Sequence, residues 1–178
     1  MRIISERQRK DIGEFFERVR DTAQRCFERD GFCTPVAILM RDGEDAVIPL
    51  GKLINHKEAA SLVLNKLIET AQPLAFVFIT EAWMASAYEL PRNPDGSLTD
   101  IEKKYGGSLT EGKDKPKKGV KEVVMLQCSA VTGESFMLSA DIVRAEGAKP
   151  TLKPWVRAEN DKAEGRFIFD VTPLAERQ

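Results

Sequence analysis

Apolar side chains recur every three or four positions between residues 6 and 29, with charged side chains between them. This spacing predicts a long helix with one buried face. Ser5 and Gln8 have the spacing of a capping box, which begins such a helix. Gly31 suits its end, because glycine readily adopts the left-handed conformation that closes a helix.

A second helix is expected at about residues 55–71, where apolar residues again follow helical spacing. Asn55 and Glu58 have a capping spacing at its start, and Pro73 lies just beyond its end. Both predicted helices are therefore amphipathic, and each needs a surface to pack on.

Residues 74–79 form a continuous apolar run that is rich in aromatic and β-branched side chains. Such a run is typical of a central strand that is buried on both faces. The strand leads directly into Glu81 and Trp83, which makes its end the first place to look for chemistry.

Two hairpins are expected on either side of that strand. Asp42-Gly43 between residues 34–40 and 45–50 is a strong hairpin signal, and Pro49 predicts an edge position for the second strand. Residues 123–131 and 135–143 form the other apolar pair, joined by a short turn with a glycine.

The remaining stretches are polar loops and one further strand. Prolines and glycines interrupt residues 86–119, which predicts a long flexible loop, and residues 147–165 are expected to be irregular. Residues 166–171 alternate as a final strand. We expect one α+β domain over residues 1–178, with two helices packed on one face of a mainly antiparallel sheet of about six strands.

The composition is that of an ordinary globular protein with little net charge. The 178 residues carry a formal charge of −1, so no global field attracts nucleic acid or a membrane surface. No apolar run approaches the roughly 18 residues of a membrane span, and the charged start differs from a secretion signal. With three cysteines expected to be reduced, the expected location is the cytoplasm; a Cys26–Cys33 disulfide is the alternative.

Three acidic residues lie in or directly after apolar strands: Glu81, Asp141 and Asp170. If the strands are neighbours, these weak catalytic candidates could hold a hard cation such as Mg²⁺, as in a metal-dependent hydrolase or nuclease. The alternative for Glu81 is a structural ion pair with Arg144 or Arg166. With one histidine and neither a phosphate-binding nor a dinucleotide-binding glycine motif, we expect no cofactor and no metal.

Binding candidates lie in the loops. Lys115, Lys117 and Lys118 belong to a basic stretch at residues 113–121, which could contact nucleic acid or simply remain solvated. Trp155 and Tyr88 are candidate aromatic anchors for a protein partner.

The strand that runs into Glu81-Ala82-Trp83-Met84, followed by a proline-rich loop and a strand pair, resembles a group of uncharacterised bacterial and phage proteins. The resemblance covers about residues 34–144. It implies a bacterial or mobile-element origin and brings no activity with it.

These patterns favour a non-enzymatic binding or regulatory module that associates with a protein partner or with itself as a homodimer. A metal-dependent hydrolase or nuclease is the first alternative. Nucleic-acid binding through the lysine-rich loop is the second.

Overall fold

The computed structural model describes residues 4–42, 44–85, 110–111, 115–116 and 119–159. They form the helices α1 (Glu6–Asp30) and α2 (Lys57–Ala71) and the short 3-10 helix η1 (Gly51–Asn55). The strands are β1 (Val36–Met40), β2 (Asp45–Pro49), β3 (Ala75–Ala85), β4 (Thr110–Glu111), β5 (Lys115–Pro116), β6 (Val120–Ala130), β7 (Ser135–Val143), β8 (Thr151–Leu152) and β9 (Val156–Glu159).

The described chain falls into two compact units. The first comprises Met1–Glu81 and Val124–Gln178, and the second is Ala82–Val123. Within the second unit, β4 and β5 form a two-stranded antiparallel sheet inside the segment that was predicted to be a long loop. The rest of residues 86–119 and the predicted strand at residues 166–171 lie outside the described residues.

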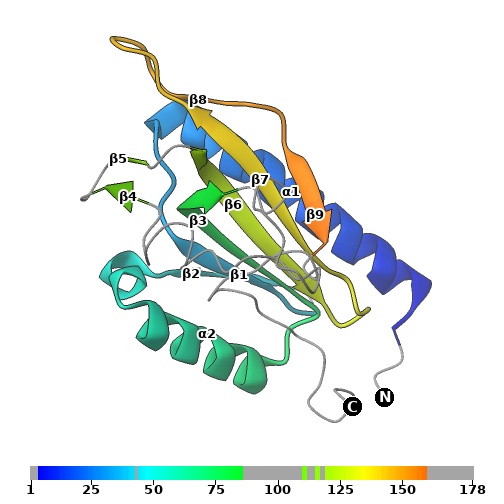
Figure 1. The fold of residues 1–178 in the computed structure, drawn as a ribbon. Helices are drawn as coiled ribbons and strands as arrows, with labels where there is room; N and C mark the ends of the chain where they lie inside the picture. Colours follow the sequence, from blue (N-terminus) through cyan, green and yellow to red (C-terminus); the bar gives the residue numbers. More distant parts are fainter. Residues whose placement is uncertain (1–3, 43, 86–109, 112–114, 117–118, 160–178) are drawn as a thin grey trace, which may run out of the picture. The chain divides into compact units, whose positions relative to one another are not determined.

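The main sheet has the order β2-β1-β3-β6-β7-β8, and β9 also pairs with β7 (Figure 1). The pairings of β1 with β2 and β3, and of β7 with β8 and β9, are antiparallel. Val131 N–H donates to Leu74 C=O over 3.0 Å, which joins the end of β6 to the start of β3, so these strands are antiparallel as well. The predicted α+β class and mainly antiparallel sheet are confirmed, with β3 in the interior.

Both ends of α1 follow the sequence signals. The Ser5 side chain and the Gln8 side chain satisfy each other's backbone N–H groups in a capping box. Gly31 is left-handed, with φ 76°, and its N–H donates to Phe27 C=O. The start of α2 differs from the prediction, because residues 51–55 form η1 and His56 becomes the N-cap without a side-chain hydrogen bond.

The two helices pack on opposite faces of the sheet, which corrects the prediction that both lie on one face. Side chains alternate along β3, so Val77 and Ile79 point to one face while Phe76 and Phe78 point to the other. The first pair lies in a core with α1, and the second pair lies in a core with α2. A strand that is apolar on both faces requires a cover on both, and the helices supply one each.

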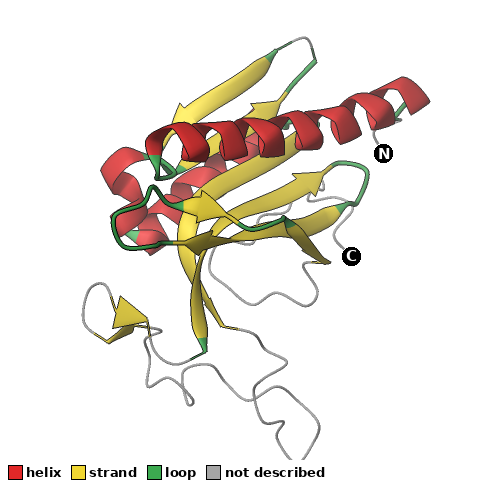
Figure 2. Cartoon of the chain, turned by 90° about the horizontal axis from the view of Figure 1, so that it is seen from above, coloured by secondary structure: helices red, strands yellow, loops and turns green. Residues whose placement is uncertain are grey.

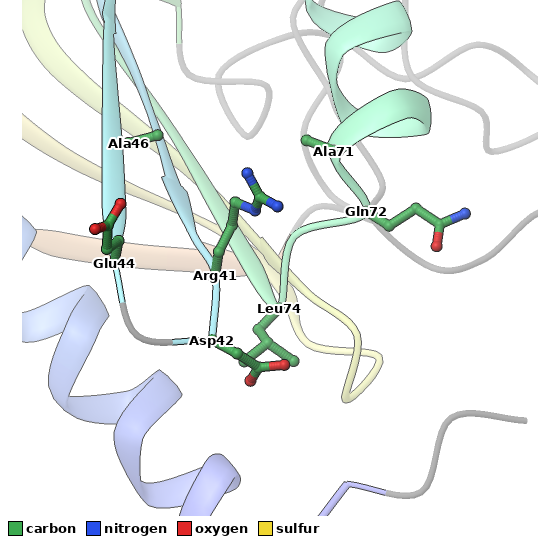
Figure 3. A pocket seen from close by; sticks show the side chains of 7 residues that line it. All are labelled: Arg41, Asp42, Glu44, Ala46, Ala71, Gln72 and Leu74. Atoms are coloured by element: carbon green, nitrogen blue, oxygen red, sulfur yellow. The ribbon is translucent and has the colours of Figure 1, made fainter.

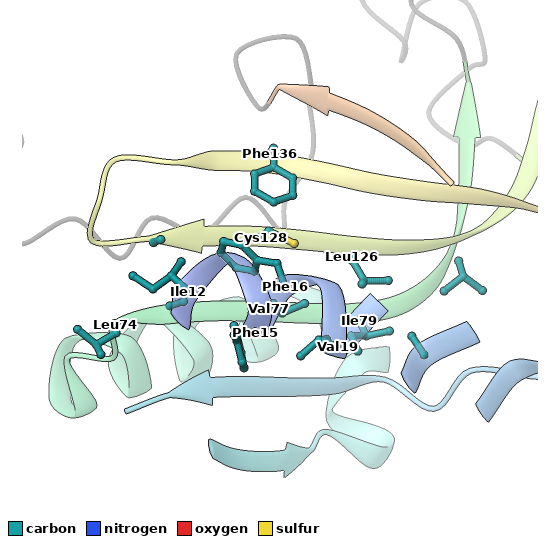
Figure 4. Close-up of a cluster of buried hydrophobic side chains, with 14 of the residues drawn as sticks. Ile12, Phe15, Phe16, Val19, Leu74, Val77, Ile79, Leu126, Cys128 and Phe136 are labelled. Atoms are coloured by element: carbon teal, nitrogen blue, oxygen red, sulfur yellow. The ribbon is translucent and has the colours of Figure 1, made fainter. Parts of the chain in front are cut away.

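The α1 core is the larger of the two (Figure 4). Figure 2 shows α1 lying over the strands of the sheet. Ile12, Phe15 and Phe27 are fully buried there, and Phe16 meets Phe136 of β7 edge to face at 5.1 Å. On the other face, Leu64 and Ile68 of α2 cover β1 and β3.

Strand β2 is an edge strand, as Pro49 predicted. Arg41 N–H donates to Glu44 C=O and Leu50 N–H donates to Pro35 C=O, which fixes the hydrogen-bonded pairs of the β1–β2 ladder. By alternation, the backbone groups of residues 45, 47 and 49 point away from β1. One of these three positions is proline and has no N–H, so the free edge offers few donors to another strand.

The segment after β7, expected to be irregular, contains β8 and β9. Both are short, and Pro154 separates them, so neither produces a recognisable apolar pattern. They form by pairing with the edge of β7. Within the described ranges, no helix is long and apolar enough to cross a membrane.

Candidate functional site

Glu81 lies within β3, at the last β3 residue that belongs to the first unit, and is held by two partners. Its Oε1 accepts a hydrogen bond from the Cys33 backbone N–H over 2.7 Å. Its Oε2 lies 3.7 Å from the Arg144 guanidinium, the arginine partner that was one of the two expected. The Glu81 side chain is 26% exposed and that of Arg144 is 45% exposed.

We call this arrangement of Glu81, Cys33 and Arg144 the Glu81 clasp. It connects three segments: the link from α1 to β1, the middle of β3 and the residue after β7. A hydrogen bond to a charged acceptor contributes about 1.5–3 kcal/mol, whereas a part-exposed ion pair contributes at most about 1 kcal/mol. The clasp thus stabilises the fold chiefly through the bond to Cys33.

The cysteines near this clasp and in the core are free thiols. Burial, followed by the Glu81 carboxylate and Cys26, raises the pKa of Cys33 to about 12. Burial also raises the pKa of Cys128 to about 12, against a smaller opposing effect of Arg157. Since thiolates are the reactive form, neither thiol is prepared for nucleophilic attack at neutral pH.

Asp141 does not join Glu81. Its carboxylate lies 3.3 Å from Lys153 Nζ, and its C=O accepts from the Lys153 N–H. Because its neighbour Ile142 faces the α1 core, alternation along β7 directs Asp141 to the opposite face of the sheet from Glu81. Asp170 lies outside the described residues.

Within the described part of the chain, a metal site shared by Glu81 and Asp141 has no geometric support. Among the residues that the structure describes, no group of three histidine, cysteine or acidic side chains is arranged to hold a metal ion. What Glu81 and Asp141 do show is a structural role, because each is engaged by a cation from a neighbouring segment.

The predicted aromatic anchor Trp155 is half-buried. It packs against the α1 core, and its Nε1–H donates to Gln24 Oε1 of α1 over 3.0 Å. Its visible contacts therefore attach the β8–β9 segment to α1. Tyr88, Lys117 and Lys118 lie outside the described residues. Lys115 lies in β5, but the structure describes only its backbone.

A hollow of about 710 Å³ lies where the β1–β2 turn approaches the end of α2 (Figure 3). Its lining consists of Arg41, Asp42, Glu44, Ala46, Ala71, Gln72 and Leu74. Figure 3 shows the Arg41 side chain directed into the space between β2 and α2. The sequence signal here, Asp42-Gly43, predicted only a turn.

Gln72 gives this hollow one unusual backbone feature. Among the described residues it is the one non-glycine with a positive φ, 44°, and its N–H donates to Ile68 C=O to end α2. The lining has mixed charges and contains neither a nucleophile nor a metal-binding cluster in the described chain. The lining therefore carries no recognisable reaction chemistry.

Leu62 and Val63, on the outer side of α2, form an exposed apolar surface that we call the α2 patch. Leu62 is 72% exposed and Val63 is 48% exposed, whereas Leu64 on the inner side is fully buried. The apolar spacing of α2 in the sequence alone assigns such residues to the core, so this surface is recognised only once the helix is oriented on the sheet.

No protein-family model, curated protein or solved structure matches this chain. The function has to be inferred from the side chains themselves.

Proposed function

We propose that this chain is a non-enzymatic binding module that associates with a second copy of itself. The observation that carries the proposal is the α2 patch, where a leucine that is 72% exposed lies beside a valine that is 48% exposed. Large apolar side chains that are adjacent and exposed are favoured at protein–protein contacts.

The non-enzymatic part is supported by the state of the acidic candidates. Glu81 is engaged by Cys33 and Arg144, and Asp141 is engaged by Lys153 on the other face of the sheet. Contacts of this kind are those of carboxylates that hold segments of a fold together, and they support a structural role for both residues.

The bacterial or mobile-element setting rests on the resemblance of the Glu81-Ala82-Trp83-Met84 segment, and a cytoplasmic location belongs to the same proposal. Nucleic-acid binding through Lys115, Lys117 and Lys118 is a separate alternative, and the structure describes none of these three side chains.

Sedimentation velocity over a range of concentrations tests whether the chain associates with itself. We expect the weight-average sedimentation coefficient to rise with concentration, whereas a constant monomer value contradicts self-association.

Thermal unfolding with and without Mg²⁺ or Mn²⁺ tests whether the acidic residues form a metal site. We expect an unchanged Tm; a rise of several degrees that is lost in Glu81→Gln and Asp141→Asn indicates a metal site.

A further inference from the structure

We infer that two copies of this chain pair through their α2 helices, antiparallel and centred on Leu62. This inference rests on the proposed self-association and assigns its surface. It begins from the orientation of α2, whose inner side is formed by Ala60, Leu64 and Ile68, buried to 5% exposure or less.

Leu62 points directly away from that inner side. A helix turns by about 100° per residue, so Leu62 lies roughly opposite the mean direction of the buried residues. Glu58 and Lys66 precede and follow it by four residues and therefore lie along the same outer face. Both are exposed, and the Lys66 side chain is 76% exposed.

The charges on this face are complementary to themselves. If two α2 helices pack antiparallel across a two-fold axis at Leu62, the two leucines meet at the centre. Glu58 of each copy then lies opposite Lys66 of the other, because both are four residues from the axis. A two-fold interface requires such self-complementarity, and the outer face of α2 provides it.

The ion pair of Lys66 with Glu69 within one chain does not prevent this contact. The two charged groups are 3.3 Å apart at exposed i,i+3 positions, where such pairs contribute little. The free edge of β2 is the competing surface, and its exposed Val47 is 61% accessible. That edge is blunted by Pro49, so the helix face is the better surface for a second copy.

The interface is small. A single helix pair buries less than the roughly 1,600 Å² of a standard interface, so we expect a dissociation constant in the micromolar range. Leu62→Glu is expected to raise the dissociation constant at least about tenfold, because the substitution places two carboxylates at the centre of the contact. Val47→Glu is the matched control on the β2 edge and is expected to leave association unchanged.

Charge exchange tests the register directly. Lys66→Glu and Glu58→Lys each place like charges opposite one another in the self-pair, so each variant alone is expected to dimerise several-fold more weakly. Mixed together, the two variants form a pair in which both contacts are complementary. Analytical ultracentrifugation of the mixture is therefore expected to show a heterodimer tighter than either homodimer, with circular dichroism confirming that both chains are folded.

The outcomes separate this inference from the proposed function. A dimer that persists in Leu62→Glu, or one that Val47→Glu dissociates, overturns the α2 pairing and leaves self-association intact. A mixture no tighter than its parts overturns the antiparallel register. A wild-type chain that is monomeric throughout overturns both.

Discussion

The Glu81 carboxylate accepts a hydrogen bond from the backbone N–H of Cys33 over 2.7 Å, although 48 residues separate them in the sequence. The bond holds the segment between α1 and β1 against β3. Glu81, a catalytic candidate from its position directly after an apolar run, thus joins two segments that are distant in the sequence.

Replacing this carboxylate tests its structural role. Glu81→Ala is expected to lower the free energy of unfolding by about 1–3 kcal/mol, because the Cys33 N–H loses its acceptor. Glu81→Gln should cost less, since an amide oxygen still accepts. Urea unfolding provides the measurement, and Glu14→Ala, which removes an exposed pair with Lys10, is the control expected within about 0.5 kcal/mol of wild type. Equal effects of Glu81→Ala and Glu14→Ala contradict the clasp.

The buried thiols predict a pH dependence. The pKa of Cys33 and that of Cys128 both rise from 9.0 to about 12 in the folded chain. The folded state therefore binds these protons more tightly than the unfolded state. The stabilisation is fully present below pH 9 and is lost as the pH rises from about 9 toward 12.

Unfolding curves between pH 7 and 10.5, compared with Cys33→Ala/Cys128→Ala, should reveal this loss. We expect the difference in stability between wild type and the double variant to shrink as the pH rises. Thiol labelling at pH 8 gives an independent check, with both cysteines reacting much more slowly in the folded than in the unfolded chain. Rapid labelling of Cys128 under native conditions contradicts its burial.

The two sides of α2 should respond differently to truncation. Leu64→Ala is expected to lower the free energy of unfolding by about 2–5 kcal/mol, because Leu64 is fully buried and its truncation leaves a cavity in the core. Leu62→Ala should lie within about 0.5 kcal/mol of wild type when measured at concentrations where the chain is monomeric. Chemical denaturation of the two variants thus checks which side of α2 faces the sheet. Equal losses of unfolding free energy would contradict the orientation in which Leu64 faces inward and Leu62 outward.

The β2 edge should become a pairing surface when its proline is removed. Pro49→Val restores a backbone N–H at an outward position and adds a β-branched side chain. We expect increased concentration-dependent association, detected by light scattering, which a further Val47→Lys suppresses. An unchanged Pro49→Val variant would show that the proline does not protect this edge.

Local signals predicted much of this fold because the start and end of several elements are determined by residues close by in the sequence. Ser5, Gln8 and Gly31 fix the ends of α1 through contacts within one turn of helix. The apolar run of β3 likewise predicted an interior strand. That run is apolar on both of its faces, and each face is covered by its own helix, which the prediction of two helices on one face did not include.

Other features depend on partners that are distant in the sequence. Strands β8 and β9 exist because the edge of β7 is available, and nothing in their few residues specifies this. The separation of Glu81 from Asp141 depends on the register of two strands, which determines the face that each side chain occupies. The outer position of Leu62 depends on how α2 is oriented on the sheet.

The molar mass of the wild-type chain in solution tests the central claim most directly. Sedimentation equilibrium across concentrations that bracket the micromolar range should show a mass rising from 19.9 kDa toward twice that value. A mass that stays at 19.9 kDa at every concentration contradicts the account of this protein as a self-associating module.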